Sequence, residues 1–172
     1  MKKISFATLR DPFVLLATIL LLLGISGVAH GQSGPKWLTL DDGQIVASEG
    51  EKVLFVFFEA QWCAICKRMK KETFPNADIL SLLENRFVPV SVDLDSKQTV
   101  FFNGKEYTER SFAKAMDVVA TPTMIFADHE GEILGETSGF YDKDRFLVLL
   151  AYLDSERFHE MTFEAYEAGE EQ

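Results

Sequence analysis

Cysteine and histidine are both scarce in this chain of 172 residues. The two cysteines, Cys63 and Cys66, are three positions apart, and the histidines are His30, His129 and His159. Zinc usually takes four ligands from Cys or His, and no histidine here has ligand spacing to the cysteine pair. The sequence therefore offers half of a metal site at most, and we expect its chemistry at the two cysteines.

Basic residues are also few. The chain has 17 Lys and Arg residues and 27 Asp and Glu residues, which gives a net charge of −10. Such a chain repels the phosphates of nucleic acids, so nucleic acid is not an expected partner. Internal repeats, low-complexity segments and a second linker are absent from the sequence as well. The part after the N-terminal segment, about 140 residues, suits one domain with its own core.

The N-terminal segment has the pattern of a secretory signal. Lys2, Lys3 and Arg10 precede an apolar run over residues 13–29, which is followed by a polar stretch. These are the n-region, the h-region and the exit of a signal peptide. An apolar run of 17 residues is also at the lower limit for an uncleaved membrane anchor. We expect a signal peptide or an anchor over residues 1–31, with the remaining chain in the periplasm or otherwise outside the cytoplasm, where disulfides persist.

The cysteine pair stands where a predicted strand turns into a predicted helix. Residues 53–58 are an apolar, β-branched and aromatic run without a helical period, and residues 67–72 are mostly good helix formers. The start of a helix has unpaired N–H groups and the positive end of the macrodipole, which stabilise a thiolate at Cys63. Cys66 lies one turn further on, so one cysteine can attack a disulfide and the other can resolve it. An inert structural disulfide is the alternative.

The rest of the chain alternates between helix and strand patterns. Residues 32–51 are a lead-in, either a short helix or irregular, with turn signals at 41–43 and 49–51. Pro89 removes a ladder donor, which places its strand at an edge or at a bulge. We expect strands at 52–59 and 87–94, helices at 63–73, 77–84, 108–116 and 142–153, hairpins at 100–107 and 123–138, and a tail in which Phe158, Met161, Phe163 and Tyr166 pack at near-helical spacing.

The first hairpin has Asn103-Gly104 at its turn, a pair that readily adopts positive φ angles. Phe101 and Tyr107 flank this turn. They either pack back on the core or present aromatic surface to a partner.

The order of these elements predicts an α/β fold with a central mixed sheet, helices on both faces and the CxxC pair at the N-terminus of the first core helix. The chain resembles the thioredoxin-fold proteins, and more closely the extracytoplasmic thiol:disulfide interchange type typified by the C-terminal domain of DsbD and by the SoxW-like thioredoxins. The resemblance covers about residues 50–153. We expect a thioredoxin-like domain with a C-terminal helical extension over residues 52–172. It is carried by Ala60, Trp62-Cys63-x-x-Cys66-Lys67, Thr73-Phe74, Val92-Asp93, Ala120-Thr121-Pro122-Thr123, Phe126, Gly131 and Gly139.

The resemblance implies a role for each residue of the motif. Cys63 would be the nucleophile and Cys66 the resolving thiol, and their redox-active disulfide would take the place of a separate cofactor. Thr121-Pro122 would hold a cis peptide bond against the disulfide, since a cis bond costs little only before proline. A trans proline that starts a strand is the alternative. With Trp62, this dipeptide would bind an extended substrate segment through its backbone.

Two departures from the family pattern bear on the mechanism. Thioredoxins usually carry a buried Asp six residues before the first cysteine, and here this position is Phe57. Glu59 lies two residues later on the same face of the strand. It is our candidate for proton transfer, and a solvated Glu at a strand end is the alternative. Ala64 and Ile65 match neither the Gly-Pro of cytosolic thioredoxin nor the Pro-His of the oxidase DsbA, so they leave the direction of exchange open.

We therefore expect an extracytoplasmic thiol:disulfide oxidoreductase that reduces protein disulfides and receives electrons from a membrane thiol reductase. The reducing direction rests on the resemblance and on no single residue. A disulfide oxidase or isomerase would use the same two cysteines. A redox-linked binding module for metal or cytochrome assembly, and a scaffold with a vestigial site, are the alternatives from other functional classes.

Overall fold

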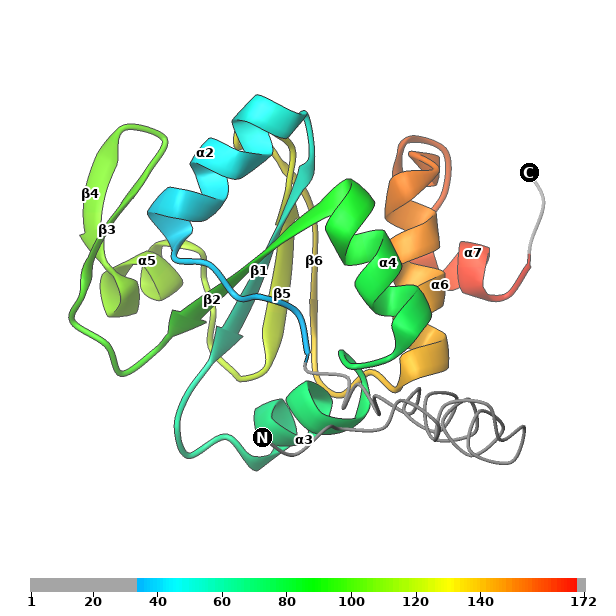
Figure 1. Cartoon of the computed structure of the whole chain (residues 1–172), viewed down its shortest axis with the longest axis horizontal. Helices are drawn as coiled ribbons and strands as arrows, with labels where there is room; N and C mark the ends of the chain where they lie inside the picture. The colour runs from blue at the N-terminus through cyan, green and yellow to red at the C-terminus, as the bar shows by residue number, and fades with distance from the viewer. Residues whose placement is uncertain (1–33, 170–172) are drawn as a thin grey trace, which may run out of the picture. The chain divides into compact units, whose positions relative to one another are not determined.

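A four-stranded mixed sheet forms the centre of the part of the chain that the computed structural model describes, residues 34–169. β1 runs parallel to β2 and antiparallel to β5, and β5 pairs antiparallel with β6 (Figure 1). The predicted central mixed sheet is therefore confirmed. Its strands, in the order β2-β1-β5-β6, are β2 (Phe87–Asp93), β1 (Val53–Glu59), β5 (Thr123–Ala127) and β6 (Ile133–Ser138).

β1 is buried on both faces, which explains why its sequence has no polar alternation. Its five central residues are each at most 2% exposed. Successive side chains of a strand point to opposite faces, so Phe55 and Phe57 pack into one core cluster while Leu54, Val56 and Phe58 pack into another. β1 therefore separates the two core clusters and contributes side chains to both.

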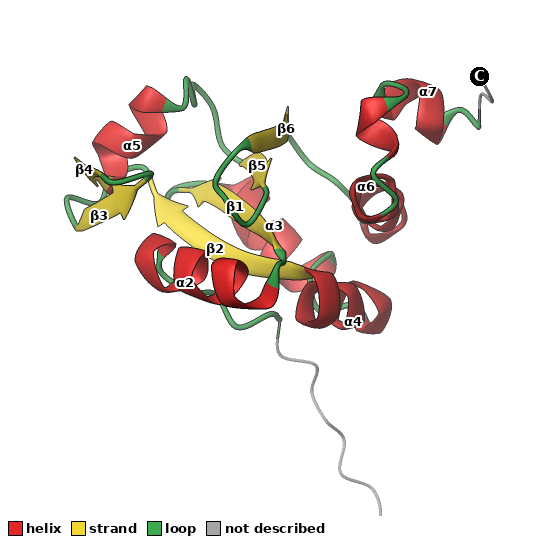
Figure 2. Cartoon of the chain, turned by 90° about the horizontal axis from the view of Figure 1, so that it is seen from above, coloured by secondary structure: helices red, strands yellow, loops and turns green. Residues whose placement is uncertain are grey.

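The helices divide between the two faces, as the sequence predicts. α3 (Ala64–Glu72), α4 (Ala77–Arg86) and α6 (Lys143–Asp154) bury side chains in the cluster that contains Phe55 and Phe57. α2 (Leu40–Gly50) and α5 (Glu109–Ala115) bury theirs in the other cluster. Figures 1 and 2 place α5 toward one side of the sheet and α6 toward the other. The predicted caps of α4, α5 and α6 are confirmed as Asn76, Thr108 and Asp142.

α2 is longer and more regular than the sequence suggests. The turn predicted at residues 41–43 is wrong, because these residues form the first turn of the helix after the N-cap Thr39. Asp41 and Asp42 are favoured there by the positive end of the macrodipole. Gly43 is required by close packing rather than by a turn, since a Cβ at this position would lie 2.1 Å from Val90 Cγ2. The lead-in at 32–51 thus contributes a helix that packs on the sheet.

β2 is an edge strand, which confirms the interpretation of Pro89. The edge is partly covered by the segment before α2, because Leu38 forms an isolated parallel bridge with Val90. The Leu38 N–H donates to Pro89 O at 3.0 Å, and Leu38 O accepts from the Ser91 N–H at 3.2 Å.

A separate hairpin, β3 (Thr99–Phe102) and β4 (Lys105–Thr108), follows β2 and lies beside α5 (Figure 2). Its turn residues Asn103 and Gly104 have φ angles of 49° and 73°, as the Asn-Gly signal predicts. The two aromatic residues behave differently. Tyr107 packs against Phe112 at a ring distance of 5.7 Å, whereas Phe101 is 49% exposed.

The C-terminal tail packs as two short helical pieces, η2 (Arg157–His159) and α7 (Phe163–Glu167), rather than as one helix. Both pieces attach to Tyr152 of α6, whose ring lies 6.4 Å from Phe158 and 5.6 Å from Phe163. The Tyr152 hydroxyl donates to Met161 O at 2.6 Å. The predicted packing of the tail is therefore confirmed.

The signal peptide or anchor predicted at 1–31 lies outside the described residues. Across residues 34–169, none of the helices has the length and apolar character needed to cross a membrane.

Candidate active site

Three loops meet the sheet at the carboxyl end of β1. Glu59, the last residue of β1, is paired with Asp93 at the end of β2, and Phe58 is paired with Thr123 at the start of β5. The loops at 60–63, 94–98 and 119–122 therefore start or end at the same edge of the sheet. The structure thus brings Trp62, the cysteines and the Thr121-Pro122 dipeptide to one edge.

The two cysteines form a disulfide, with their Cα atoms 5.3 Å apart. Cys63 is the N-cap of α3, and its sulfur accepts a hydrogen bond from the Cys66 N–H at 3.0 Å. Cys63 is 5% exposed while Cys66 is completely buried, so Cys63 is the sulfur that a partner can reach. After reduction, the same N–H group and the macrodipole favour the thiolate at Cys63.

An aromatic layer packs in the same core cluster as the disulfide. Phe57, which occupies the position of the expected Asp, is completely buried there. Its ring meets Phe74 edge-on at 5.1 Å, and Trp37 lies 5.4 Å from Phe57 and 5.2 Å from Phe74. This position therefore supplies packing and no carboxylate.

Glu59 is largely withdrawn from solvent, with 18% of its side chain exposed. Its carboxylate pairs with the Lys70 ammonium of α3 and accepts a hydrogen bond from the Ser91 hydroxyl of β2. The Lys70 ammonium also lies 5.1 Å from the Trp37 ring. Glu59 is therefore a paired and partly buried carboxylate at the end of the strand. No hydrogen bond joins Glu59 to a cysteine within the described residues, so its role in proton transfer stays a prediction.

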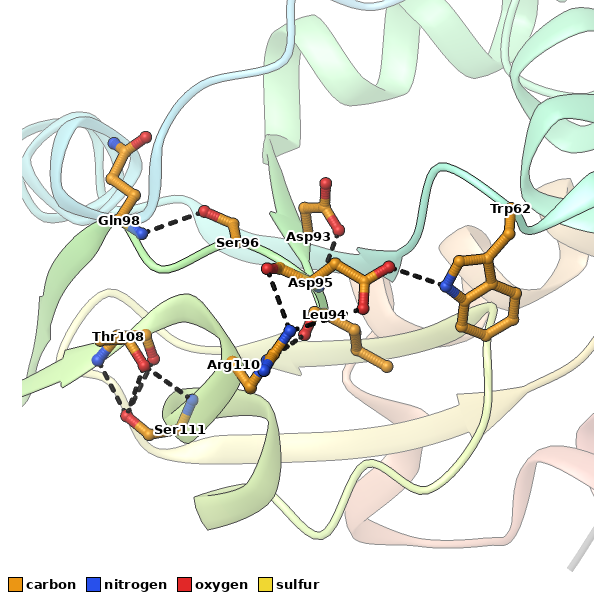
Figure 3. A network of polar contacts seen from close by, with 9 residues as sticks. All are labelled: Trp62, Asp93, Leu94, Asp95, Ser96, Gln98, Thr108, Arg110 and Ser111. Carbon is orange, nitrogen blue, oxygen red and sulfur yellow. Dashed lines mark hydrogen bonds and ion pairs between the residues drawn. The ribbon is translucent and has the colours of Figure 1, made fainter.

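Trp62 is held in place from the loop that follows β2 (Figure 3). Its indole Nε1–H donates to Asp95 Oδ2 at 2.7 Å although the residue is 67% exposed. Arg110, in the first turn of α5, donates to Asp95 O at 3.3 Å and to Leu94 O at 3.4 Å, and its guanidinium lies 3.8 Å from Asp95 Oδ1. The Asp95 N–H donates to Asp93 Oδ1 at 2.9 Å. An exposed aromatic ring beside the nucleophile is thus oriented by a second element.

The Thr121–Pro122 peptide bond is cis, as predicted. Pro122 O accepts from the Gly139 N–H at 2.9 Å, which ties this loop to the end of β6. Thr121 Oγ1 is buried and has no hydrogen-bond partner in the described part of the chain. Two residues earlier, Val119 is 97% exposed. With Trp62, this loop gives the site an apolar, accessible rim.

Glu109 is a buried acidic residue that the sequence does not reveal, since a Glu at the start of a helix is ordinarily solvated. It is 8% exposed. Burial raises the pKa of its carboxyl above the ordinary value, contacts with the Ser96 side chain and the Asp93 backbone lower the pKa in part, and the charges of Asp93 and Glu59 raise it further. The carboxylates at the ends of β1 and β2 therefore both raise the pKa of Glu109.

We expect Arg110→Gln to loosen Trp62. The substitution removes the ion pair with Asp95 and weakens the contacts to the loop carbonyls, so the indole N–H should exchange with solvent about two- to fivefold faster. Nuclear magnetic resonance of the Trp62 indole resonance measures this rate. Arg86→Gln is the control, because it breaks an exposed Arg–Asp pair with Asp154 that involves neither Trp62 nor its loop. Equal exchange rates in the two variants would contradict the assignment.

We expect Glu109→Gln to stabilise the protein more at pH 7 than at pH 4. The pKa of Glu109 is raised in the folded state, so its ionisation disfavours folding once the pH exceeds its unfolded pKa, and the penalty disappears when both states are protonated. Gln lacks this penalty at every pH. Thermal unfolding at the two pH values gives the difference between variant and parent, and a difference that does not grow with pH would refute the prediction.

Comparisons with known proteins agree with this geometry. Residues 40–154 match the family model described as a thioredoxin-like domain. The thiol:disulfide interchange protein DsbD of Photorhabdus laumondii is 27% identical over 120 residues, which cover 68% of this chain and 19% of DsbD. An uncharacterized protein of Archaeoglobus fulgidus is 28% identical over 88 residues, covering 51% of this chain and 69% of the relative. This chain therefore spans about a fifth of the length of DsbD.

A solved structure, a thioredoxin-fold protein from Helicobacter pylori, superposes with a TM-score of 0.59 at 18% identity, over 70% of this chain and 84% of the other. At this identity the likeness shows the fold alone, and it confirms the predicted thioredoxin fold. The resemblance to the DsbD interchange proteins is confirmed by sequence. With a CxxC disulfide at the start of α3, the chain is a thiol:disulfide oxidoreductase and belongs to the thioredoxin-like domain family.

Proposed function

We propose that this oxidoreductase works outside the cytoplasm and reduces protein disulfides, with Cys63 as the nucleophile and Cys66 as the resolving thiol. The observation that carries the proposal is the asymmetry of the pair. Cys63 caps α3, accepts the Cys66 N–H and is the more exposed sulfur, whereas Cys66 is completely buried. A partner therefore reacts with Cys63 first. The buried Cys66 reacts only within the chain, by attacking the Cys63 sulfur.

The exchange proceeds in two steps. The Cys63 thiolate attacks one sulfur of a substrate disulfide, which forms a mixed disulfide and releases the other substrate sulfur as a thiolate. Cys66 then loses its proton and attacks the Cys63 sulfur, so the Cys63–Cys66 disulfide forms and the substrate leaves as a dithiol. Two electrons pass to the substrate. A membrane thiol reductase is the proposed donor that restores the two thiols.

The substrate segment binds at Trp62 and at Thr121-Pro122. Trp62 presents an exposed ring that Asp95 orients. The backbone of the dipeptide pairs with an extended chain in strand-like fashion.

The proton of Cys66 passes to Glu59 in this proposal. Glu59 follows Phe57 on the same face of β1, the face whose core cluster contains Cys66. Its pairing with Lys70 and Ser91 keeps the carboxylate in one position.

The location and the direction rest on two observations. The N-terminal pattern of residues 1–31 is that of a signal peptide or anchor. The relative found in Photorhabdus laumondii is named a thiol:disulfide interchange protein. No residue of the site sets the direction by itself.

We expect Cys66→Ser to accumulate mixed disulfides with disulfide-bonded model proteins, because Cys63 can still attack while nothing inside the chain resolves the product. Non-reducing electrophoresis followed by mass spectrometry identifies the adducts at Cys63. Cys63→Ser is the matched control and should form none. A metal-binding module would instead lose metal affinity in both variants and form no adducts.

We expect the Cys63–Cys66 pair to have a reduction potential of about −250 mV or lower, in the range of reducing thioredoxins. Equilibration with glutathione at neutral pH, with the thiols trapped by alkylation, measures it. A value of about −120 mV, in the range of the oxidant DsbA, would overturn the reducing direction and make the protein a disulfide donor.

A further inference from the structure

α3 is a basic element in an acidic chain. Four of its nine residues are Lys or Arg and one is acidic, whereas the whole chain has a net charge of −10. The proposed exchange mechanism uses the start of this helix and, among the basic residues, only Lys70, which holds Glu59. The other three basic residues have no role in the exchange steps.

The four basic side chains have different surroundings. Lys70 turns inward to Glu59, and its side chain is 31% exposed. Arg68 pairs with Glu72 at 2.7 Å, and its guanidinium lies 4.2 Å from the centre of the Phe140 ring. Lys67 and Lys71 are exposed, and neither forms an ion pair with any residue between 34 and 169.

The two exposed lysines stand in line with the nucleophile. Residues four apart lie on one face of a helix, so Cys63, Lys67 and Lys71 form a row with a rise of about 6 Å between neighbours. Basic residues in a last turn also stabilise the helix dipole, which accounts for Lys71. It does not account for Lys67, which lies in the first half of α3, directly after Cys66.

An exposed aromatic residue comes just before this row in the chain. Trp62 is 67% exposed and directly precedes Cys63. The loop at 94–98 that holds Trp62 has no such excess of positive charge, because it carries Asp95 and Lys97. Arg110 neutralises part of the charge of Asp95. The positive charge near Cys63 is therefore concentrated along α3.

We propose that the row of Lys67 and Lys71, with Trp62, docks a protein partner that carries acidic residues beside its reactive cysteine. The inference rests on the proposed exchange function and adds the chemistry of the partner. An acidic partner is repelled by most of this chain and attracted by α3, so it approaches with its cysteine toward Cys63. Such charge complementarity acts mainly on the rate of encounter and on orientation.

The test compares three model peptides with the same disulfide loop and different flanks, either Asp and Glu, Ser and Gln, or Lys and Arg. The rate constant for reduction of each peptide by the reduced protein is measured at low and at high ionic strength. At low salt we expect the acidic peptide to react about tenfold faster than the basic one. The difference should largely disappear in about 0.5 M salt, because exposed charges are then screened.

Lys67→Gln/Lys71→Gln should remove the preference for the acidic peptide. The control is Lys114→Gln/Lys143→Gln, which makes the same change in net charge at exposed lysines of α5 and at the start of α6, and it should keep the preference. Rates are expressed relative to the Ser and Gln peptide in each protein, so that a changed reactivity of Cys63 cancels.

The outcomes separate the two proposals. Equal rates for the three peptides, or a preference that survives Lys67→Gln/Lys71→Gln, would overturn the docking surface and leave the reductase function intact. Failure to reduce any of the three peptides would overturn the proposed function and this inference with it.

Discussion

The geometry of the site depends on where α3 begins. Because the Cys66 N–H donates to the Cys63 sulfur, Cys63 is the N-cap residue and its sulfur meets the positive end of the macrodipole. A start one residue earlier or later would turn this sulfur away from the helix terminus. β1 sets the starting point, since it is buried on both faces and ends at Glu59, four residues before Cys63. A strand that is buried on both faces thus places the attacking sulfur.

The replacement of an expected Asp by Phe57 changes how the buried thiol can lose its proton. An ionised carboxylate at the position of Phe57, packed against Phe74 and Trp37, would cost folding free energy without partners. Phe57 avoids this cost, and it also leaves the position without a group that could take the proton. The nearest carboxylate along this face of the strand is Glu59, which Lys70 and Ser91 hold at the end of β1. The carboxylate on this face of β1 thus lies at the end of the strand, where α3 and β2 each provide a partner for it.

Much of the fold was predictable because local signals and tertiary packing agree. The run at 53–58, the caps Asn76, Thr108 and Asp142 and the Asn103-Gly104 turn each act within a few residues, and each prediction is confirmed. The start of α2 differs from the sequence prediction because Asp-Asp-Gly is typical of a turn, while the actual constraint on Gly43 is the Val90 side chain 47 positions away. The arrangement of Trp62, Asp95 and Arg110 and the burial of Glu109 depend on the path of the loop at 94–98, for which the sequence has no periodic signal.

The proposed reaction requires that two different partners reach Cys63 in turn, one to be reduced and one to supply electrons. In each exchange the mixed disulfide holds the partner covalently, so tight non-covalent binding is unnecessary and would slow release. A positive row on α3 and a fixed aromatic ring suit this requirement, since exposed charges raise the rate of encounter more than they raise affinity. The same surface must serve both partners, because Cys66 is buried and offers no second approach. Substrate and donor are therefore expected to share the chemistry that α3 selects, even though their disulfides react in opposite directions.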